Sequence, residues 1–258
     1  MDWKKESEMF NRAADYYDRY RPGYPQEIID ALIAETGISA GSLLLEIGAG
    51  SGKATAQLAG RGYEILCIDP GADLTAIGNE RFTNESIRFE TARFEEYDLP
   101  AQAFDLIFAA QAFHWVPQPI GYERCAYALK DNAFLAPFWN MYVVRDNDMD
   151  NELLAISRQY GGFADFLTEE QCEERIRSIA AGLTDSRLFT PPKIIRQTWE
   201  KDYTAEEFYN FALTGNFFIQ RSDSEKAAAR EALAELANRH SGVIKRPYLC
   251  VLYLSQNL

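Results

Sequence analysis

The sequence predicts an α/β fold built on a doubly wound, mostly parallel β-sheet. Short apolar runs typical of buried strands alternate with segments of helix-forming residues over most of the first 140 positions. The first of these runs ends in Gly48, Gly50 and Gly52, and glycine lets a backbone turn sharply and approach a ligand closely. Because ligands of such sheets bind at the carboxyl ends of the strands, this glycine loop marks the expected site.

Seven strands are expected, each a short run rich in apolar residues. The runs lie at 42–47, 64–69, 87–90, 104–110, 133–139, 193–199 and 248–254. The second run ends in an acid, Asp69, close to the expected ligand.

Helices are expected before and between these strands. The first, 6–20, has its apolar residues at helical spacing, and the prolines and glycine of 21–25 end it. Thr204 with Glu207 three residues later is the pattern of a helix N-cap. The remaining helices are expected at 26–35, 53–59, 70–79, 119–130, 204–213 and 223–239.

The alternation of strands and helices stops between residues 141 and 192, and this segment is predicted to form helices. We therefore expect a core with N-terminal helices over 1–140, an inserted helical cap over 141–192, and the remainder of the core sheet with its helices over 193–258.

Composition narrows the function classes. The 258 residues carry a formal net charge of −13 without a local block of Lys and Arg, which disfavours a nucleic-acid partner. No apolar run approaches the roughly 18–20 residues that span a bilayer, so no membrane partner is expected. The four cysteines are far apart and form no CxxC pair, so no metal site is expected. The N-terminus lacks the apolar stretch of a signal peptide, and we expect a cytoplasmic protein.

Glycine spacing separates two classes of nucleotide-binding loop. The dinucleotide fingerprint has its third glycine where this chain has Lys53. Glu46 followed by three alternate glycines is instead the pattern of class I S-adenosylmethionine (SAM) methyltransferases. The whole chain resembles that family, and more narrowly its small-molecule branch, methyltransferase type 11, which includes the trans-aconitate methyltransferase-like proteins. The stretches that carry the resemblance are 10–25, 45–52, 93–96, 104–115, 138–140 and 246–248.

The resemblance implies a Rossmann-like methyltransferase fold with SAM as the cofactor. Gly48, Gly50 and Gly52 would approach its methionine and ribose portion. Asp69 would accept both ribose hydroxyls, and capping of the following helix is the alternative role. Glu46 would lie near the methionine end, although it could equally be a buried partner for a backbone amide. The sequence departs from the family at 131–133, Asp-Asn-Ala, where a Gly-Gly turn is usual.

Four further residues are assigned to the cofactor and substrate by the same resemblance. Arg93 and Phe94 follow the third strand at the adenine edge, where Phe94 could pack on the ring or be an ordinary core aromatic. Tyr17 and Arg21 come from the N-terminal helix and its exit, which in this family closes over the SAM site. Arg21 could pair with a carboxylate of the cofactor or substrate, or form a surface ion pair.

The acceptor side is expected just past the fourth strand, at Gln111, His114 and Trp115. A loop that follows a rigid strand is where substrate-binding groups are commonly placed. His114 could contact substrate or act as a base, and packed structural roles for His114 and Trp115 are the alternative.

The expected function is methyl transfer from SAM to a small-molecule acceptor, leaving S-adenosylhomocysteine. The branch resemblance points to a carboxylate acceptor, which needs no base because it is ionised at neutral pH; a hydroxyl or amine would draw on His114. A non-catalytic SAM-binding regulatory protein is the alternative, and an NAD-dependent oxidoreductase is disfavoured by the glycine spacing. We expect a monomer or homodimer.

Overall fold

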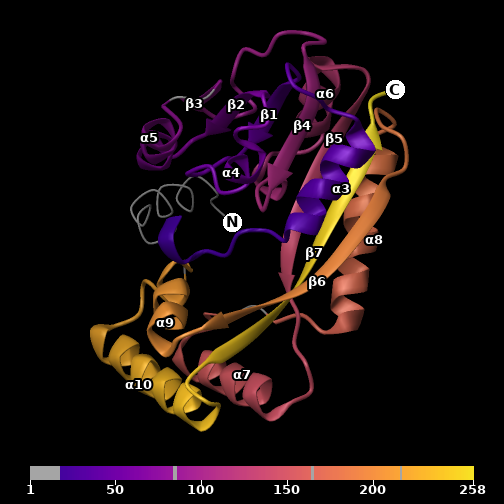
Figure 1. Cartoon of the computed structure of the whole chain (residues 1–258). Helices are drawn as coiled ribbons and strands as arrows, with labels where there is room; N and C mark the ends of the chain where they lie inside the picture. The colour runs from indigo at the N-terminus through magenta and orange to yellow at the C-terminus, as the bar shows by residue number, and fades with distance from the viewer. Residues whose placement is uncertain (1–17, 84–85, 164–165, 216) are drawn as a thin grey trace.

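A seven-stranded sheet organises the part of the chain that the structure describes, in the order β3-β2-β1-β4-β5-β7-β6 (Figure 1). This computed structural model describes residues 18–83, 86–163, 166–215 and 217–258. All neighbouring pairs from β3 to β5 are parallel, whereas β7 runs antiparallel to both β5 and β6. The strands are β1 (Leu43–Ile47), β2 (Glu64–Asp69), β3 (Ile87–Thr91), β4 (Phe104–Ala110), β5 (Leu129–Tyr142), β6 (Lys193–Tyr203) and β7 (Ile244–Gln256). The predicted doubly wound, mostly parallel α/β class is confirmed.

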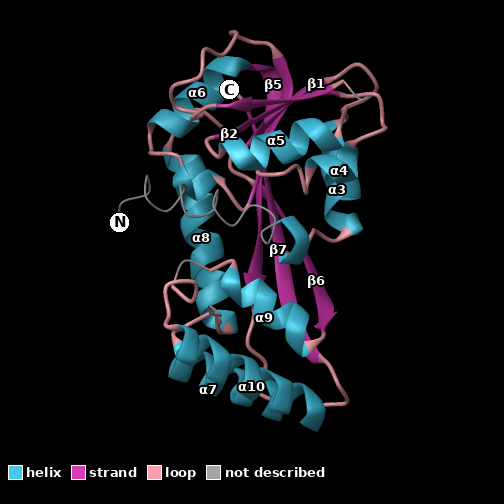
Figure 2. Cartoon of the chain, turned by 90° about the vertical axis from the view of Figure 1, so that its left-hand side faces the viewer, coloured by secondary structure: helices cyan, strands magenta, loops and turns pink. Residues whose placement is uncertain are grey.

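Helices cover both faces of this sheet, as Figure 2 shows, with α3, α4 and α5 on one side and α6 and α8 on the other. Adjacent strand residues point to opposite faces, so Leu44 packs in the core beneath α3 while Leu45 packs in the core beneath α6 and α8. The helices are α3 (Gln26–Thr36), α4 (Thr55–Leu58), α5 (Ala72–Arg81), the 3-10 helix η1 (Phe113–Trp115), α6 (Ile120–Ala128), α7 (Asp148–Tyr160), α8 (Glu169–Asp185), α9 (Ala205–Leu213) and α10 (Asp223–Arg239).

A third hydrophobic core lies where β6 and β7 extend beyond the rest of the sheet (Figure 1). Helices α7 and α9 both contact α10 there, and buried aromatic side chains such as Phe208 and Phe218 fill the space between them. The expected cap segment, 141–192, is divided in space: α7 joins this helical layer, and α8 packs its Ile176 on the sheet. The boundaries proposed for core, cap and remainder stay a prediction.

Two local predictions concern helix ends. The capping box of α9 is confirmed, because Thr204 Oγ1 accepts a hydrogen bond from the Glu207 amide and the Glu207 carboxylate accepts from the Thr204 amide. The predicted helix 6–20 lies mostly outside the described residues, and 18–20 are helical. No helix in the described ranges has the length and apolar character needed to cross a membrane.

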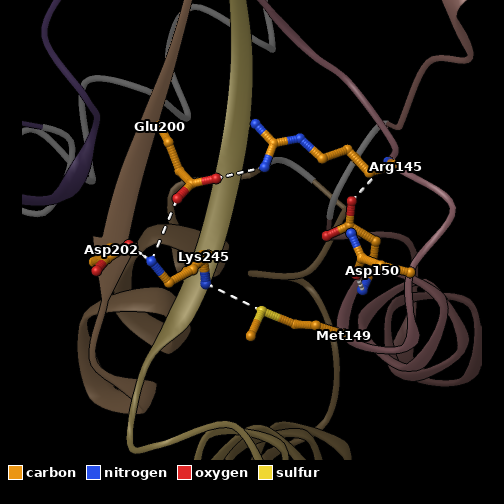
Figure 3. Close-up of polar contacts among 7 residues, drawn as sticks. Arg145, Met149, Asp150, Glu200, Asp202 and Lys245 are labelled. Carbon is orange, nitrogen blue, oxygen red and sulfur yellow. Dashed lines mark hydrogen bonds and ion pairs between the residues drawn. The ribbon is translucent and has the colours of Figure 1, made fainter.

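A polar network joins the loop before α7 to the extended ends of β6 and β7 (Figure 3). Arg145 Nη1 lies 2.5 Å from Glu200 Oε2, and Lys245 Nζ lies 3.5 Å from Glu200 Oε1. The Arg145 amide donates to Asp150 Oδ2 at 2.7 Å, and the Lys245 amide donates to Met149 Sδ at 3.2 Å. The ion pairs are partly exposed, where such pairs contribute about 0–1 kcal/mol each, so the network orients the loop more than it stabilises the fold.

The three loop glycines all adopt left-handed backbone conformations, with φ of 65° at Gly48, 57° at Gly50 and 84° at Gly52. Their surroundings differ. A Cβ on Gly52 would lie 2.7 Å from a ring carbon of Phe82 and 2.8 Å from one of Phe89, whereas a Cβ on Gly50 would meet nothing within 4 Å. Gly52 is therefore required by the packing beneath the loop, and Gly50 faces open space.

We predict that Gly52→Ala destabilises the protein more than Gly50→Ala does. Both variants carry the left-handed backbone cost of about 1–2 kcal/mol, and only Gly52→Ala adds the overpacking cost of about 1–3 kcal/mol. Urea denaturation of the two variants measures the difference directly. Equal losses of stability would contradict the packing role assigned to Gly52.

Candidate functional site

A pocket of about 370 Å³ opens at the carboxyl ends of β1, β2, β4 and β5. This volume is in the range of small-molecule and cofactor sites. Residues from the loops after these strands line it, together with residues from α8 and the segment before α3. Ten of the predicted site residues line it: Arg21, Glu46, Gly48, Gly50, Asp69, Arg93, Phe94, Gln111, His114 and Trp115. Gly52 does not line it, and Tyr17 lies outside the described residues.

Asp69 joins the glycine loop to the start of α5. Its Oδ2 accepts a hydrogen bond from the Gly50 amide and its Oδ1 accepts one from the Gly71 amide, both at 2.8 Å. Burial raises the pKa of Asp69, and these two amides act in the opposite direction. The N-cap of α5 is Gly71 and no side chain caps this helix, so Asp69 does not have the capping role considered as its alternative. Each carboxylate oxygen retains a second lone pair for a ligand.

Glu46 lies at the carboxyl end of β1 and is only 1% exposed. Its Oε2 accepts a hydrogen bond from the hydroxyl of Thr55, the first residue of α4. Burial, with a smaller contribution from the negative charge of Asp69, raises the pKa of Glu46 to about 8 against the effect of the hydrogen bonds from Thr55. The carboxyl group is therefore protonated at pH 7 in the ligand-free protein.

Phe94 is a core residue that also lines the pocket, and its packing on an adenine ring stays a prediction. The Arg124 guanidinium lies 5.7 Å from its ring centroid, and Arg124 Nε donates to the Phe94 carbonyl at 3.0 Å. Arg93 is oriented by Glu95, with 3.8 Å between Nη1 and Oε1. The segment after β3 thus presents an aromatic face with its backbone held in place.

His114 is fixed by a hydrogen bond from Trp139 of β5, whose indole Nε1 donates to Nδ1 at 3.1 Å. An indole N–H can only donate, so Nδ1 carries no proton and Nε2 carries it. Burial lowers the pKa of His114 to about 4, with a further contribution from Arg175, although part of the residue is exposed. His114 therefore presents an N–H donor to a ligand, and its basic nitrogen is occupied by Trp139.

Gln111 occupies a strained position directly after β4, with a φ of 59°. Its amide donates to the Phe138 carbonyl at 2.9 Å, and its side-chain Nε2 donates to the Asn140 carbonyl at 3.2 Å. Its Oε1 is buried and has no hydrogen-bond partner among the described residues. Buried acceptors are normally satisfied, so this oxygen offers an acceptor to a bound molecule.

Arg21 reaches across the far side of the pocket. Its Nη1 donates to the Tyr142 hydroxyl and its Nη2 to the Thr214 carbonyl, both at 3.2 Å. Its guanidinium carbon lies 5.3 Å from the Phe211 ring centroid. These contacts hold the segment before α3 against the C-terminal end of α9.

Sequence reasoning missed Arg175, which lines the pocket from α8. Its positive charge contributes to the lowered pKa of His114, so it lies on the same side of the pocket as His114. It is exposed and forms no hydrogen bond or ion pair with any residue that the structure describes. Helical spacing from the buried Cys172 and Ile176 could have placed Arg175 beside the packed face of α8, but no sequence signal shows which cavity that face borders.

The acidic residues of the pocket lie at one end of it. Its three acids, Glu46, Asp69 and Glu95, come from β1, β2 and the segment after β3. The end near His114 and Tyr142 is lined by the cations Arg21 and Arg175 with no carboxylate from the described residues. Lys53 of the glycine loop and Arg93, which pairs with Glu95, lie among the acids. The end with all three acids is called the acidic end, and the end with Arg21 and Arg175 is called the basic end.

Part of this chain is similar to known methyltransferases. Residues 45–136 match the family described as "Methyltransferase domain". An uncharacterised methyltransferase of Schizosaccharomyces pombe is 32% identical over 134 residues, which are 52% of this chain and 51% of that protein. The "Probable S-adenosylmethionine-dependent methyltransferase CRG1" of Saccharomyces cerevisiae is 26% identical over 163 residues, 61% of this chain and 55% of that protein. The chain spans about half the length of the curated relatives it matches.

The fold is shared with solved structures over most of the chain. The YcgJ protein from Bacillus subtilis superposes with a TM-score of 0.58 at 14% identity, covering 90% of this chain and 99% of that one. The narrower likeness to the trans-aconitate methyltransferase branch stays a prediction. Residues 45–136 of this chain thus match a methyltransferase domain, and the chain has the Rossmann-like fold of solved methyltransferase structures.

Proposed function

We propose that this protein transfers a methyl group from SAM to a small-molecule acceptor. One observation carries the proposal: a single pocket joins the glycine loop and Asp69 to Gln111 and His114. A methyl donor and an acceptor must meet within one enclosed space for an in-line displacement to occur. The methyltransferase domain match and the SAM dependence stated in the name of the yeast relative support the same function.

The acidic end fits SAM. Gly50 leaves space where a Cβ would otherwise enter the pocket, and Asp69 has carboxylate lone pairs for ribose hydroxyls. Phe94 offers an aromatic face to adenine, and Glu46 offers a carboxyl group to a cationic methionine end. When bound, SAM supplies an electrophilic methyl group on a positively charged sulfur.

The basic end fits an anionic acceptor, and we propose a carboxylate. Arg21 and Arg175 supply positive charge, and His114 supplies the N–H donor at Nε2. A carboxylate is already ionised at neutral pH, so the acceptor needs no base, in keeping with the engagement of His114 Nδ1 by Trp139. The role of this chain is then to bind and orient the acceptor and to exclude water from it.

A non-catalytic SAM-binding regulatory role is the alternative. Catalysis is favoured because the pocket continues past the glycine loop to His114 and Trp115. A purely regulatory SAM site would not need this additional space. All four cysteines are free and buried, which fits the reducing cytoplasm that we propose as the location.

We predict that Asp69→Asn weakens SAM binding by about tenfold or more. A hydrogen bond to a charged partner contributes about 1.5–3 kcal/mol, and the substitution removes the charge. Isothermal titration of SAM and of S-adenosylhomocysteine into the purified variant measures the loss. Asp73→Asn, in the first turn of α5 and outside the pocket lining, is the matched control.

Two outcomes of this titration would count against the proposal. Unchanged affinity in Asp69→Asn would mean that the ribose does not bind at Asp69. If the wild-type protein binds NAD and neither SAM nor S-adenosylhomocysteine, the function itself is wrong.

We predict that Arg175→Gln raises the KM for the acceptor about tenfold or more while leaving SAM affinity unchanged. The reason is that a guanidinium facing an anion in a partly enclosed site forms charge-assisted hydrogen bonds that Gln cannot replace. S-adenosylhomocysteine release is measured with a panel of small carboxylic acids, phenols and amines. Arg177→Gln, exposed on the same helix and outside the pocket lining, is the control. Turnover of phenols or amines alone, unaffected by Arg175→Gln, would overturn the carboxylate assignment.

A further inference from the structure

Glu46 combines burial with direct access to the pocket. It is the penultimate residue of β1, between Cys67 of β2 and Phe108 of β4 in the sheet register. The side chain is 1% exposed and yet lines the pocket. A ligand in the pocket therefore meets this carboxyl group in a space that bulk water reaches poorly.

The groups packed around Glu46 do not compensate a negative charge. Thr55 of α4 donates its hydroxyl to Glu46, and its backbone amide also acts on the carboxyl group. The Thr55 hydroxyl lies 3.4 Å from the thiol sulfur of Cys67. Asp69 of β2 adds a second carboxylate, and burial raises the pKa of the Cys67 thiol well above its usual range. β4 contributes Phe108, which does not titrate.

The cations of the pocket are engaged elsewhere or lie apart from Glu46. Lys53, Arg21, Arg93 and Arg175 line the pocket. None of these four cations is among the groups that shift the pKa of Glu46. A carboxyl group in such surroundings holds its proton until a positive charge arrives, because removal of a charge from water is costly and a nearby opposite charge offsets that cost.

We propose that Glu46 releases its proton when the pocket takes up the cationic end of SAM, so that binding of the methyl donor is coupled to ionisation of Glu46. The O–H bond of the carboxyl group breaks, the proton passes to the buffer, and the resulting carboxylate balances the positive charge of the ligand. This inference rests on the proposed function. It goes beyond it by making the charge of the ligand, and not its shape alone, a condition for tight binding.

The coupling has a defined pH dependence. The ligand binds the ionised carboxylate, and the pKa of Glu46 in the free protein is about 8. Below pH 8 the ionised fraction of Glu46 therefore increases up to tenfold for each unit by which the pH rises. As the pH rises from 6 to 7.5, the Kd for SAM is therefore expected to decrease by up to tenfold per pH unit. A neutral analogue, 5′-methylthioadenosine, lacks the amino-acid end and the sulfonium charge, so its Kd should not change over this range.

The test is isothermal titration of SAM at pH 7 in phosphate and in Tris, two buffers with different ionisation enthalpies. The wild-type protein is expected to release close to one proton per SAM bound, seen as a buffer-dependent binding enthalpy. Glu46→Gln keeps the shape and the Thr55 contact, and it should bind SAM more weakly, release no proton and lose the pH dependence. Glu95→Gln, a second pocket acid that is paired with Arg93, should release the proton as the wild type does.

An infrared difference spectrum provides a readout that does not depend on affinity. Addition of SAM to the wild-type protein should remove the C=O band of a protonated carboxyl group, and the band should be absent from the Glu46→Gln difference spectrum. SAM binding with no proton release and no loss of this band would overturn the ionisation proposal and leave the proposed function standing. Absence of SAM binding to the wild-type protein would overturn the proposed function.

Glu46 should also destabilise the ligand-free fold at neutral pH. The pKa of a glutamate in an unfolded chain lies near 4.5, below the folded value of about 8, so the unfolded state gains stability as pH rises between these values. Glu46→Gln is therefore predicted to melt at a higher temperature than the wild type, with a difference that widens from pH 5 to pH 8. Thermal denaturation across this range measures it, and a constant difference would contradict the raised pKa.

Discussion

The buried carboxylate of Asp69 is the interaction on which the site depends. One oxygen holds the Gly50 amide and the other holds the Gly71 amide, so a single side chain fixes the turn after β1 and the turn after β2 in one geometry. A buried carboxylate needs hydrogen bonds to remain charged, and loop amides need acceptors. The Asp69 carboxylate and the two amides therefore satisfy each other's hydrogen-bonding requirement. The glycine loop is held open toward the pocket by this contact, and Gly50 is the glycine that faces the resulting space.

The opposite end of the pocket is held by β5. Trp139 orients His114, and Asn140 accepts a hydrogen bond from Trp199 of β6 and donates one to the Gly23 carbonyl. These neighbouring residues of one strand thus connect the loop after β4, the edge strand and the segment that precedes α3. This end of the pocket is built from parts far apart in the sequence, and the rigidity of β5 keeps their spacing constant.

Strand positions could be predicted where apolar runs and pairing coincide. β2 and β4 begin and end at the expected residues, because both are central parallel strands buried on both faces. β6 and β7 are longer than expected, since antiparallel pairing continues through polar residues such as Lys245 and Asp202 that carry no strand signal. β5 is longer at both ends, where it pairs in parallel with β4 at Leu129 and antiparallel with β7 over 140–142. Asn132, within β5, adopts a left-handed φ of 61°, which asparagine tolerates better than most residues.

The class of fold, the glycine loop and the acids near the ends of β1 and β2 follow from the amino-acid sequence, because strand periodicity and loop glycines are local properties of the chain. The contacts that each of these residues makes depend on long-range packing. The tertiary structure shows that Gly52 is needed by Phe82 and Phe89, that His114 is turned by Trp139, and that Arg175 reaches the pocket from α8. It also decided the protonation of Glu46, because a pKa depends on burial and on neighbouring charges that long-range packing brings together.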